Sequence, residues 1–281
     1  MNLLEEIQVF CFYSKNSPFT QMKHRFYGAS FHLRKKIKLK DVFMYQNYIF
    51  DLYGTLADTH TNEGKAYLWN KLSAYFSSVG AMYSPSELKK AYWNYVRQEE
   101  AKYDDPYVEI QLDGVFEKLF TLKGVTPNRQ LIESVGNIMR ILSRDYIKLY
   151  DGVMDFLQDL KRHGKGIYLL SNAQRLFTES ELKILGIYDL FDGIYISSDK
   201  GVKKPSPKFM EMLLSEYHLD RKKSIMIGND CSSDVAVANA CNMDSLFIHA
   251  NISPPLPKEI PATYAILDGD FRKVSPLILK Q

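Results

Sequence analysis

Four short apolar runs in the second half of the chain alternate with stretches of helical periodicity, and this alternation constrains the fold more than any other feature. The runs cover residues 166–170, 193–196, 224–227 and 245–248. Each is short and continuously apolar, as expected for a strand that is buried on both faces. Strands separated by helices form βαβ units, which build a mostly parallel sheet covered by helices. We therefore expect an α/β fold with a three-layer, Rossmann-like parallel sheet core.

A fifth apolar run, residues 48–52, lies far upstream of these four and is followed by Gly54 and Thr55. This pattern is typical of a buried strand that ends in a tight turn. We place the strand in the same sheet, because alone it could not bury both of its faces. The block that follows contains no convincing strand. Its apolar residues repeat at helical spacing in two stripes, which are Leu68, Leu72, Tyr75, Phe76 and Val79, then Leu131, Val135, Ile138, Met139, Leu142 and Tyr146.

A helix start is predicted between these two stripes. Ser84 suits an N-cap, Pro85 the first helical position, and Glu87 the acid of a capping box. We expect the helix to run through about Glu100. The middle block of the chain is therefore predicted to be all-helical.

The predicted elements divide the chain into three parts. Residues 45–58 and 150–281 form the core domain, and residues 59–149 form a helical cap inserted at the carboxyl edge of its sheet. Residues 1–44 show no clear periodicity and carry eight Lys or Arg against three Asp or Glu. They open with acidic residues, unlike a secretory leader. A flexible basic tail, an upstream start codon with translation from Met44, and a basic arm for a partner all fit this segment.

Composition narrows the functional classes. The chain has no run of eighteen apolar residues, so we expect no membrane span. The body after the basic segment carries slightly more acidic than basic residues, which disfavours a nucleic-acid binder. Three cysteines, Cys11, Cys231 and Cys241, are too few for a disulfide framework or a spaced zinc site. This cysteine usage indicates a reducing, cytoplasmic environment.

Polar side chains directly follow the predicted strands, at the edge where open parallel sheets bind their ligands. The candidates are Asp51, Tyr53 and Thr55 after the first strand, Ser171 and Asn172 after the second, Lys204 after the third, and Asp230 and Asp234 after the fourth. Clustered carboxylates repel one another unless a cation lies among them, and hard oxygen ligands suit Mg²⁺. A lysine, a hydroxyl and a metal together can neutralise the charge of a phosphoryl group.

In this arrangement the chain resembles the haloacid dehalogenase (HAD) superfamily of hydrolases. The segments similar to its four motifs are Ile49–Leu56 with Asp51 as nucleophile, Leu170–Asn172, Lys204-Pro205 and Gly228–Asp234. They follow the family's order, each at a strand end, and cover the chain from about Tyr45 to Ile248. One such motif alone would be weak, whereas four in sequence are a strong signal. The helical insertion resembles the family's C1-type cap.

The resemblance implies a two-step phosphoryl transfer. Asp51 would attack the phosphorus of a phosphomonoester, and water would then hydrolyse the aspartyl-phosphate. Ser171 would donate to a phosphoryl oxygen, Lys204 would pair with its charge, and the further substrate-binding candidates are Thr55 and Asn172. The Mg²⁺ ligands would be Asp51, the Tyr53 carbonyl, Asp230 and, directly or behind the other ligands, Asp234. The cap would close over the site, exclude water and select the substrate.

Tyr53 departs from the pattern of the family's phosphatases, which usually carry a second aspartate two residues after the nucleophile as general acid and base. A phenol with an ordinary pKa of about 10 cannot act as a base at neutral pH and is a sluggish acid. Good leaving groups such as acyl phosphates should therefore react best. Tyrosine at this place is instead similar to L-2-haloacid dehalogenases, whose halide leaves without a proton.

The fourth motif favours the phosphatase. Dehalogenases of the family need no Mg²⁺ and are less acidic there, whereas this chain has Asp230 and Asp234. They also place an arginine early in the cap to receive the halide, and none occurs between Asp51 and Arg97. Asn229, where many members have aspartate, leaves the ligand set open. We expect a Mg²⁺-dependent hydrolase of a small phosphorylated metabolite, with an L-2-haloacid dehalogenase and a weakly active HAD-like binding protein as alternatives.

Overall fold

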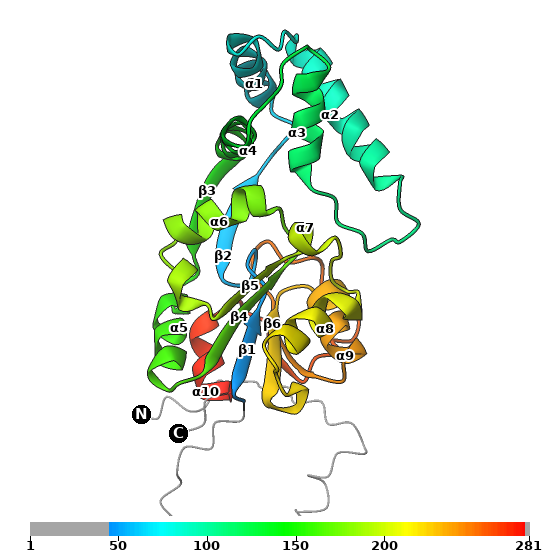
Figure 1. The fold of residues 1–281 in the computed structure, drawn as a ribbon. Coiled ribbons are helices and arrows are strands. Elements are labelled where there is room, and N and C mark those ends of the chain that lie inside the picture. The colour runs from blue at the N-terminus through cyan, green and yellow to red at the C-terminus, as the bar shows by residue number, and fades with distance from the viewer. Residues whose placement is uncertain (1–44, 279–281) are drawn as a thin grey trace, which may run out of the picture.

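The computed structural model describes residues 45–278, which form a sheet-containing core and a helical unit beyond one edge of the sheet (Figure 1). The predictions made for residues 1–44 lie outside the described residues. None of the helices within the described range has the length and apolar composition needed to cross a membrane.

The core is built on a parallel six-stranded sheet, as the alternation of apolar runs predicts. In spatial order its strands are β5 (Gly193–Ile196), β4 (Gly166–Ser171), β1 (Asn47–Phe50), β6 (Ser224–Gly228), β7 (Asp244–Ile248) and β8 (Tyr264–Ile266). All five predicted runs became strands, and every neighbouring pair is parallel. The edge strand β8 was not predicted, because three residues carry too short a pattern to recognise.

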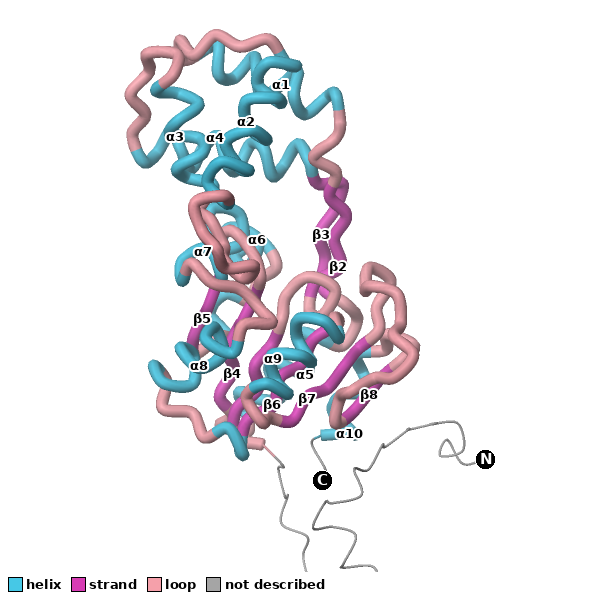
Figure 2. Tube along the Cα trace, turned by 90° about the vertical axis from the view of Figure 1, so that its right-hand side faces the viewer, coloured by secondary structure: helices cyan, strands magenta, loops and turns pink. Residues whose placement is uncertain are grey.

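Helices cover both faces of this sheet and complete the three predicted layers (Figures 1 and 2). Tyr48 and Phe50 of β1 pack with α5 and α10 on one face, while Ile49 between them packs with α8 and α9 on the other. This division follows from the alternation of side chains along a strand. The core helices are α5 (Val153–Arg162), α6 (Arg175–Ile184), α7 (Ser197–Lys200), α8 (Pro207–Glu216), α9 (Ala236–Ala240) and α10 (Val274–Ile278), with short helical turns η2 (Tyr188–Leu190), η3 (Arg221–Lys223), η4 (Cys231–Val235) and η5 (Phe271–Lys273).

The helical unit has an apolar core of its own. It consists of α1 (Ala66–Ser78), α2 (Pro85–Glu100), α3 (Leu112–Thr121) and α4 (Arg129–Ser143). The predicted capping box is confirmed, since the Ser84 hydroxyl accepts from the Glu87 amide and the Glu87 carboxylate accepts from the Ser84 amide. Leu176 and Phe177 of α6 join the apolar core of this unit, so the helices pack directly on the core domain.

A two-stranded antiparallel sheet connects the two units and corrects the prediction of an all-helical middle block. It pairs β2 (Ala57–Thr61) with β3 (Arg144–Leu149). The second predicted helical stripe, which includes Tyr146, is too long. Helix α4 ends at Ser143, and Tyr146 belongs to β3. Strand β2 is mostly polar. Its Asp58 is buried and accepts hydrogen bonds from the Tyr146 hydroxyl across the pair and from the Asn251 side-chain amide. Such a strand has no apolar pattern to recognise.

A second connection is made by the loop between α2 and α3, which docks on the core beside α7. Val108 forms an antiparallel bridge with Val202. On either side of it, the Glu109 amide donates to the Gly201 carbonyl and the Lys203 amide donates to the Tyr107 carbonyl. The helical unit is therefore attached to the core at this loop as well as through β2 and β3.

Candidate active site

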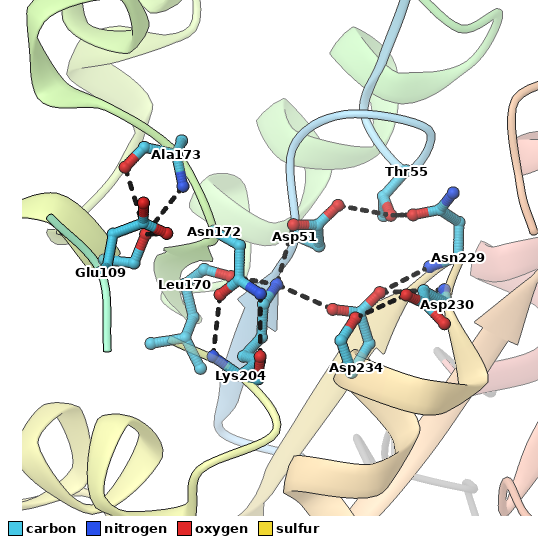
Figure 3. A network of polar contacts seen from close by, with 12 residues as sticks. Asp51, Thr55, Glu109, Leu170, Asn172, Ala173, Lys204, Asn229, Asp230 and Asp234 are labelled. Atoms are coloured by element: carbon cyan, nitrogen blue, oxygen red, sulfur yellow. Dashed lines mark hydrogen bonds and ion pairs between the residues drawn. The ribbon is translucent and has the colours of Figure 1, made fainter. Parts of the chain in front are cut away.

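Several of the predicted site residues lie at the carboxyl ends of three adjacent strands. Asp51 directly follows β1, Ser171 ends β4, and Asn229 directly follows β6. Because β4, β1 and β6 are parallel neighbours, their carboxyl ends meet at one edge of the sheet. Lys204 reaches the same place from the loop after α7 (Figure 3).

Lys204 is the electrostatic centre of this cluster. Its ammonium lies 2.8 Å from Asp51 Oδ1 and 2.7 Å from Asp234 Oδ1, and it donates to the Leu170 carbonyl at 2.6 Å. Three acceptors use the full donor capacity of an ammonium group. Burial by itself would lower the pKa of Lys204, but the two carboxylates outweigh it and hold that pKa above its ordinary value. Lys204 is therefore a cation at neutral pH.

Asn172 fixes the backbone that carries this lysine. Its side-chain amide donates to the Lys204 carbonyl at 2.9 Å, and its oxygen accepts from the Lys204 amide at 2.8 Å. Both polar atoms of the side chain are thus engaged within the protein. Asn172, predicted to bind substrate, lies at the site as a support for Lys204.

Asp234 also lies at the site, with both carboxylate oxygens engaged by protein groups. Oδ2 accepts from the amides of Asn229 and Asp230, each at 3.0 Å, while Oδ1 pairs with Lys204. Gly228 allows this close approach, because a Cβ there would lie 2.3 Å from the Asp234 side chain. Burial raises the pKa of Asp234 to about 6, so the group is ionised at neutral pH. Asp234 therefore anchors the loop after β6 to Lys204.

Thr55 and Asn229 lie on the other side of the nucleophile candidate. The Thr55 hydroxyl is 3.3 Å from Asp51 Oδ2 and 3.3 Å from Asn229 Oδ1. Gly54 has a φ of 83°, and a Cβ there would lie 2.2 Å from the Asn229 side chain. Only glycine fits this turn. The sequence reasoning did not include Asn229 among the site residues, although its place directly after β6 matches that of Asp51 after β1.

The structure does not bring the Asp230 carboxylate to this cluster. Oδ1 accepts from both the amide and the hydroxyl of Ser232 at 2.7 Å, and Oδ2 accepts from the Ser233 hydroxyl at 3.0 Å. Asp230 thereby caps η4. Among the described residues, no contact joins its carboxylate to Asp51 or Lys204.

Tyr53 also directs its side chain away from the nucleophile candidate. Its hydroxyl lies 2.5 Å from Glu181 Oε2 and 3.1 Å from the Thr178 hydroxyl, both on α6. Burial, reinforced by the Glu181 charge, raises the pKa of Tyr53 above its ordinary value. Within residues 45–278 the phenol makes no contact with Asp51. It is a neutral donor to Glu181.

Ser171 differs from Asp230 and Tyr53, because its hydroxyl makes no hydrogen bond to any described residue. The residue is fully buried, and its Oγ has no hydrogen-bond partner among the described residues. A buried polar group without a partner costs stability, so it is rare in folded proteins. It follows directly after Leu170, whose carbonyl binds Lys204. A donor is thus held ready for an acceptor that enters from outside the protein.

A magnesium site must be built from the oxygens that remain available. No cluster of three or more His, Cys, Asp or Glu suited to a metal occurs within the described part of the chain. Among residues 45–278, the one hydrogen bond to Asp51 Oδ2 and to Asn229 Oδ1 comes from the shared Thr55 hydroxyl, and the Tyr53 carbonyl follows two residues after Asp51. One carboxylate with neutral oxygens fits Mg²⁺, which commonly uses one or two carboxylates and keeps water and phosphate oxygens as its other ligands.

Comparisons with known proteins identify the family of the chain. A family model for haloacid dehalogenase-like hydrolases matches residues 45–242, from the start of the described core to two residues beyond α9. Phosphoserine phosphatase from Thermus thermophilus is 25% identical over 126 residues, which cover 45% of this chain and 49% of that protein. The chain thus spans about half the length of the curated relatives it matches first.

Two solved structures extend the likeness over most of the chain. The HAD-hydrolase YfnB from Bacillus subtilis, bound to magnesium, has a TM-score of 0.50 and 16% identity over 83% of this chain and 98% of its own. A dehalogenase with an intermediate complex has a TM-score of 0.52 and 16% identity over 85% of this chain and 100% of its own. At such identities the likeness shows the fold alone, and it supports the α/β core.

Proposed function

Because this chain belongs to the haloacid dehalogenase-like hydrolases, we propose that it is a Mg²⁺-dependent phosphatase of a small phosphorylated metabolite. Asp51 serves as the nucleophile, and the reaction passes through an aspartyl-phosphate. The relative from Thermus thermophilus is a phosphoserine phosphatase, which supports phosphate ester chemistry at this site. The helical unit acts as the cap, of the C1 type.

The unpartnered Ser171 hydroxyl is the observation that carries this proposal. It is a buried donor one residue from the carbonyl that binds Lys204, and Lys204 is a buried cation. A donor beside a cation suits an anionic oxygen that brings its own acceptors. A phosphoryl group bound here would satisfy Ser171 and place its phosphorus near Asp51.

The chemistry follows from the roles of these side chains. An Asp51 oxygen attacks phosphorus while the bond to the leaving oxygen breaks, and water later displaces Asp51 to release phosphate. Lys204 holds the Asp51 carboxylate in place by donating a hydrogen bond to Oδ1, the oxygen that does not attack. Mg²⁺ would be held by the Asp51 carboxylate, the Tyr53 carbonyl and the Asn229 side-chain oxygen. Asp234 would support this set from behind as the anchor of the loop after β6, and the Asp230 carboxylate, which caps η4, would stay outside it. When bound there, the ion would neutralise charge on the phosphoryl oxygens.

Replacing Ser171 with alanine tests the carrying observation. We expect Ser171→Ala to leave the melting temperature unchanged or slightly raised, because the variant loses a polar group that has no partner. Its kcat/KM for phosphate esters should fall by about 10- to 100-fold, since a hydrogen bond to a charged oxygen is lost. Calorimetry and phosphate release measure the two effects. Ser245→Ala is the control, because Ser245 Oγ is also buried and unpartnered. Equal activity of both variants would contradict the role of Ser171.

The position of Tyr53 predicts a steep dependence on the leaving group. Its hydroxyl is held by Glu181 and its raised pKa disfavours ionisation, so no proton reaches the leaving oxygen from this residue. General acid catalysis usually contributes about 10²- to 10⁴-fold, and only leaving groups that need no proton escape its loss. We expect acetyl phosphate and aryl phosphates to exceed alkyl phosphates in kcat/KM by about that factor. Rates that are flat across this series would mean that another residue supplies the proton.

L-2-haloacid dehalogenation is the second candidate, and Tyr53 is the observation that favours it. Halide leaves without a proton, so a tyrosine held by Glu181 does not impair that reaction. The two reactions separate when purified protein is incubated with phosphorylated metabolites and 2-haloacids, with Mg²⁺ and with chelator. Metal-dependent phosphate release supports the phosphatase, and metal-independent halide release supports the dehalogenase. Release of neither product would favour a weakly active binding protein.

A further inference from the structure

A buried carboxylate lies where four segments of the chain meet. The Glu181 side chain on α6 is 2% exposed and accepts hydrogen bonds on both oxygens. Oε1 lies 2.7 Å from Arg140 Nε of α4 and 2.5 Å from an Arg144 nitrogen of β3. Oε2 lies 3.3 Å from a second Arg140 nitrogen and 2.5 Å from the Tyr53 hydroxyl. One side chain thus joins α6, the helical unit, the connecting sheet and the loop after Asp51.

The charges at this junction depend on one another. The Arg140 and Arg144 side chains are 14% and 13% exposed, so neither guanidinium group is well solvated without Glu181. Arg140 also lies 5.3 Å from the centre of the Tyr53 ring, within cation–π distance. Glu63, between β2 and α1, interacts with the same arginine. The arginine charge lowers the pKa of Glu63, but burial has the larger effect and raises that pKa above its ordinary value. Loss of one partner would leave buried charges unpaired.

This arrangement makes the placement of the helical unit and the position of Tyr53 depend on each other. Four donors satisfy one carboxylate in a single relative placement of α4, β3 and α6, because the Arg140 fork is planar and rigid. Tyr53 is held in that placement and lies two residues after Asp51, in the turn that supplies the proposed metal-binding carbonyl. A shift of the helical unit must therefore break bonds to Glu181 and release Tyr53.

We propose that Glu181 is a positioning residue that couples the placement of the helical unit to the loop that carries the nucleophile. The inference rests on the proposed function for its effect on catalysis, and on the contacts alone for its effect on the junction. Glu181 does not touch the reacting atoms. It acts through Tyr53, Arg140 and Arg144.

The chain offers a matched control for the test. Glu179 lies two residues away on the same helix and forms partly exposed pairs with Arg175 and Lys183. Glu179→Gln therefore removes one carboxylate charge from α6 outside the junction, whereas Glu181→Gln removes it inside. Two substrates separate the effects, since acetyl phosphate is smaller than p-nitrophenyl phosphate and presents less surface to the helical unit.

We expect Glu181→Gln to lower kcat/KM for p-nitrophenyl phosphate by about tenfold or more, because small misplacements of reacting groups have effects of this size. For acetyl phosphate the loss should stay below about threefold, and Glu179→Gln should match the wild type with both substrates. A merely structural residue would lower both rates equally, through the fraction of folded protein. Equal losses with the two substrates would overturn the proposal.

Hydrogen exchange gives a readout that needs no activity. In Glu181→Gln, the amides of β2 and β3 should exchange about tenfold faster than in Glu179→Gln, while those of β6 exchange alike. Unchanged exchange in β2 and β3 would overturn the inference even if the phosphatase assignment holds. Conversely, a wild-type protein that hydrolyses no phosphate ester would contradict the proposed function. The hydrogen-exchange result would then still test the role of Glu181 at the junction.

Tyr53→Phe keeps the proposal testable if Glu181→Gln fails to fold. It removes one hydroxyl and leaves both arginine pairs with Glu181 in place. We expect the same selective loss for p-nitrophenyl phosphate, about threefold, and no further loss when Tyr53→Phe is added to Glu181→Gln. A Tyr53→Phe protein identical to the wild type with both substrates would overturn the coupling.

Discussion

Asp51→Asn should abolish phosphate release, lowering kcat by about 10⁴-fold or more, as expected when a covalent nucleophile is removed. An amide has nearly the shape of the carboxylate but cannot form the acyl phosphate. The change also removes one of the two charges that face Lys204, while Asp234 still compensates that cation. Steady-state phosphate release measures the loss. Intact mass after acid quench should show a phosphorylated wild type and an unmodified variant.

The matched control for this variant is Asp155→Asn, on the surface of α5 and outside the site. It should retain wild-type activity, which excludes a general effect of losing one negative charge. Activity that survives in Asp51→Asn would contradict the nucleophile role or reveal a contaminating phosphatase. Repeating the purification with a different tag and column separates these two explanations.

Lys204→Met should lower both stability and activity, and it is the single substitution with the largest combined effect. Methionine has a similar length but leaves the Asp51 and Asp234 carboxylates buried without their cation. Breaking a buried ion pair from one side costs about 3–5 kcal/mol of unfolding free energy. Chemical denaturation measures this loss, and kcat should fall by about 10²-fold or more because the carboxylate loses its positioning. Lys208→Met, an exposed lysine on α8, is the control.

The same variant should respond to pH in a defined direction. In the wild type, burial raises the pKa of Asp234 and the Lys204 charge partly offsets this rise. The net result is a pKa of about 6. Without Lys204 this pKa rises further, so the folded variant binds protons that the unfolded chain does not. The stability lost in Lys204→Met should therefore shrink as the pH falls from 8 to 5. A loss that is independent of pH would mean that Asp234 does not take up the proton.

The sheet was predictable from the sequence because its strands are buried on both faces. Burial on both sides forces a continuous apolar run, and each of the five runs became a strand. Strands β2 and β3 lack this signature, since Asp58 is held by the Tyr146 hydroxyl rather than by apolar contact. Their pairing depends on partners that are far apart in the chain, which no local pattern records.

The site was predictable to a similar extent and for a similar reason. Parallel strands place their carboxyl ends together, so Asp51, Ser171 and Lys204 were expected at one edge of the sheet. Asp51 pairs with Lys204, and Ser171 follows Leu170, whose carbonyl accepts from the same lysine. Which of two neighbouring residues faces Asp51 depends on the turn after β6, where Asn229 approaches and Asp230 caps η4. The partner of Tyr53 lies 128 residues away, beyond the reach of spacing arguments.

The docked loop between α2 and α3 limits how the helical unit can rock. Figure 2 shows α7, next to which this loop docks, and the β2–β3 ribbon on opposite sides of the molecule. The helical unit is held at these two places in addition to its packing on α6, so a rotation of the unit must break contacts at one of them. At the loop tether, the amide of Lys203 donates to the Tyr107 carbonyl, one residue before Lys204. Breaking this hydrogen bond would loosen the backbone next to Lys204, whose ammonium faces Asp51. A movement of the helical unit would therefore also change the position of the Lys204 charge.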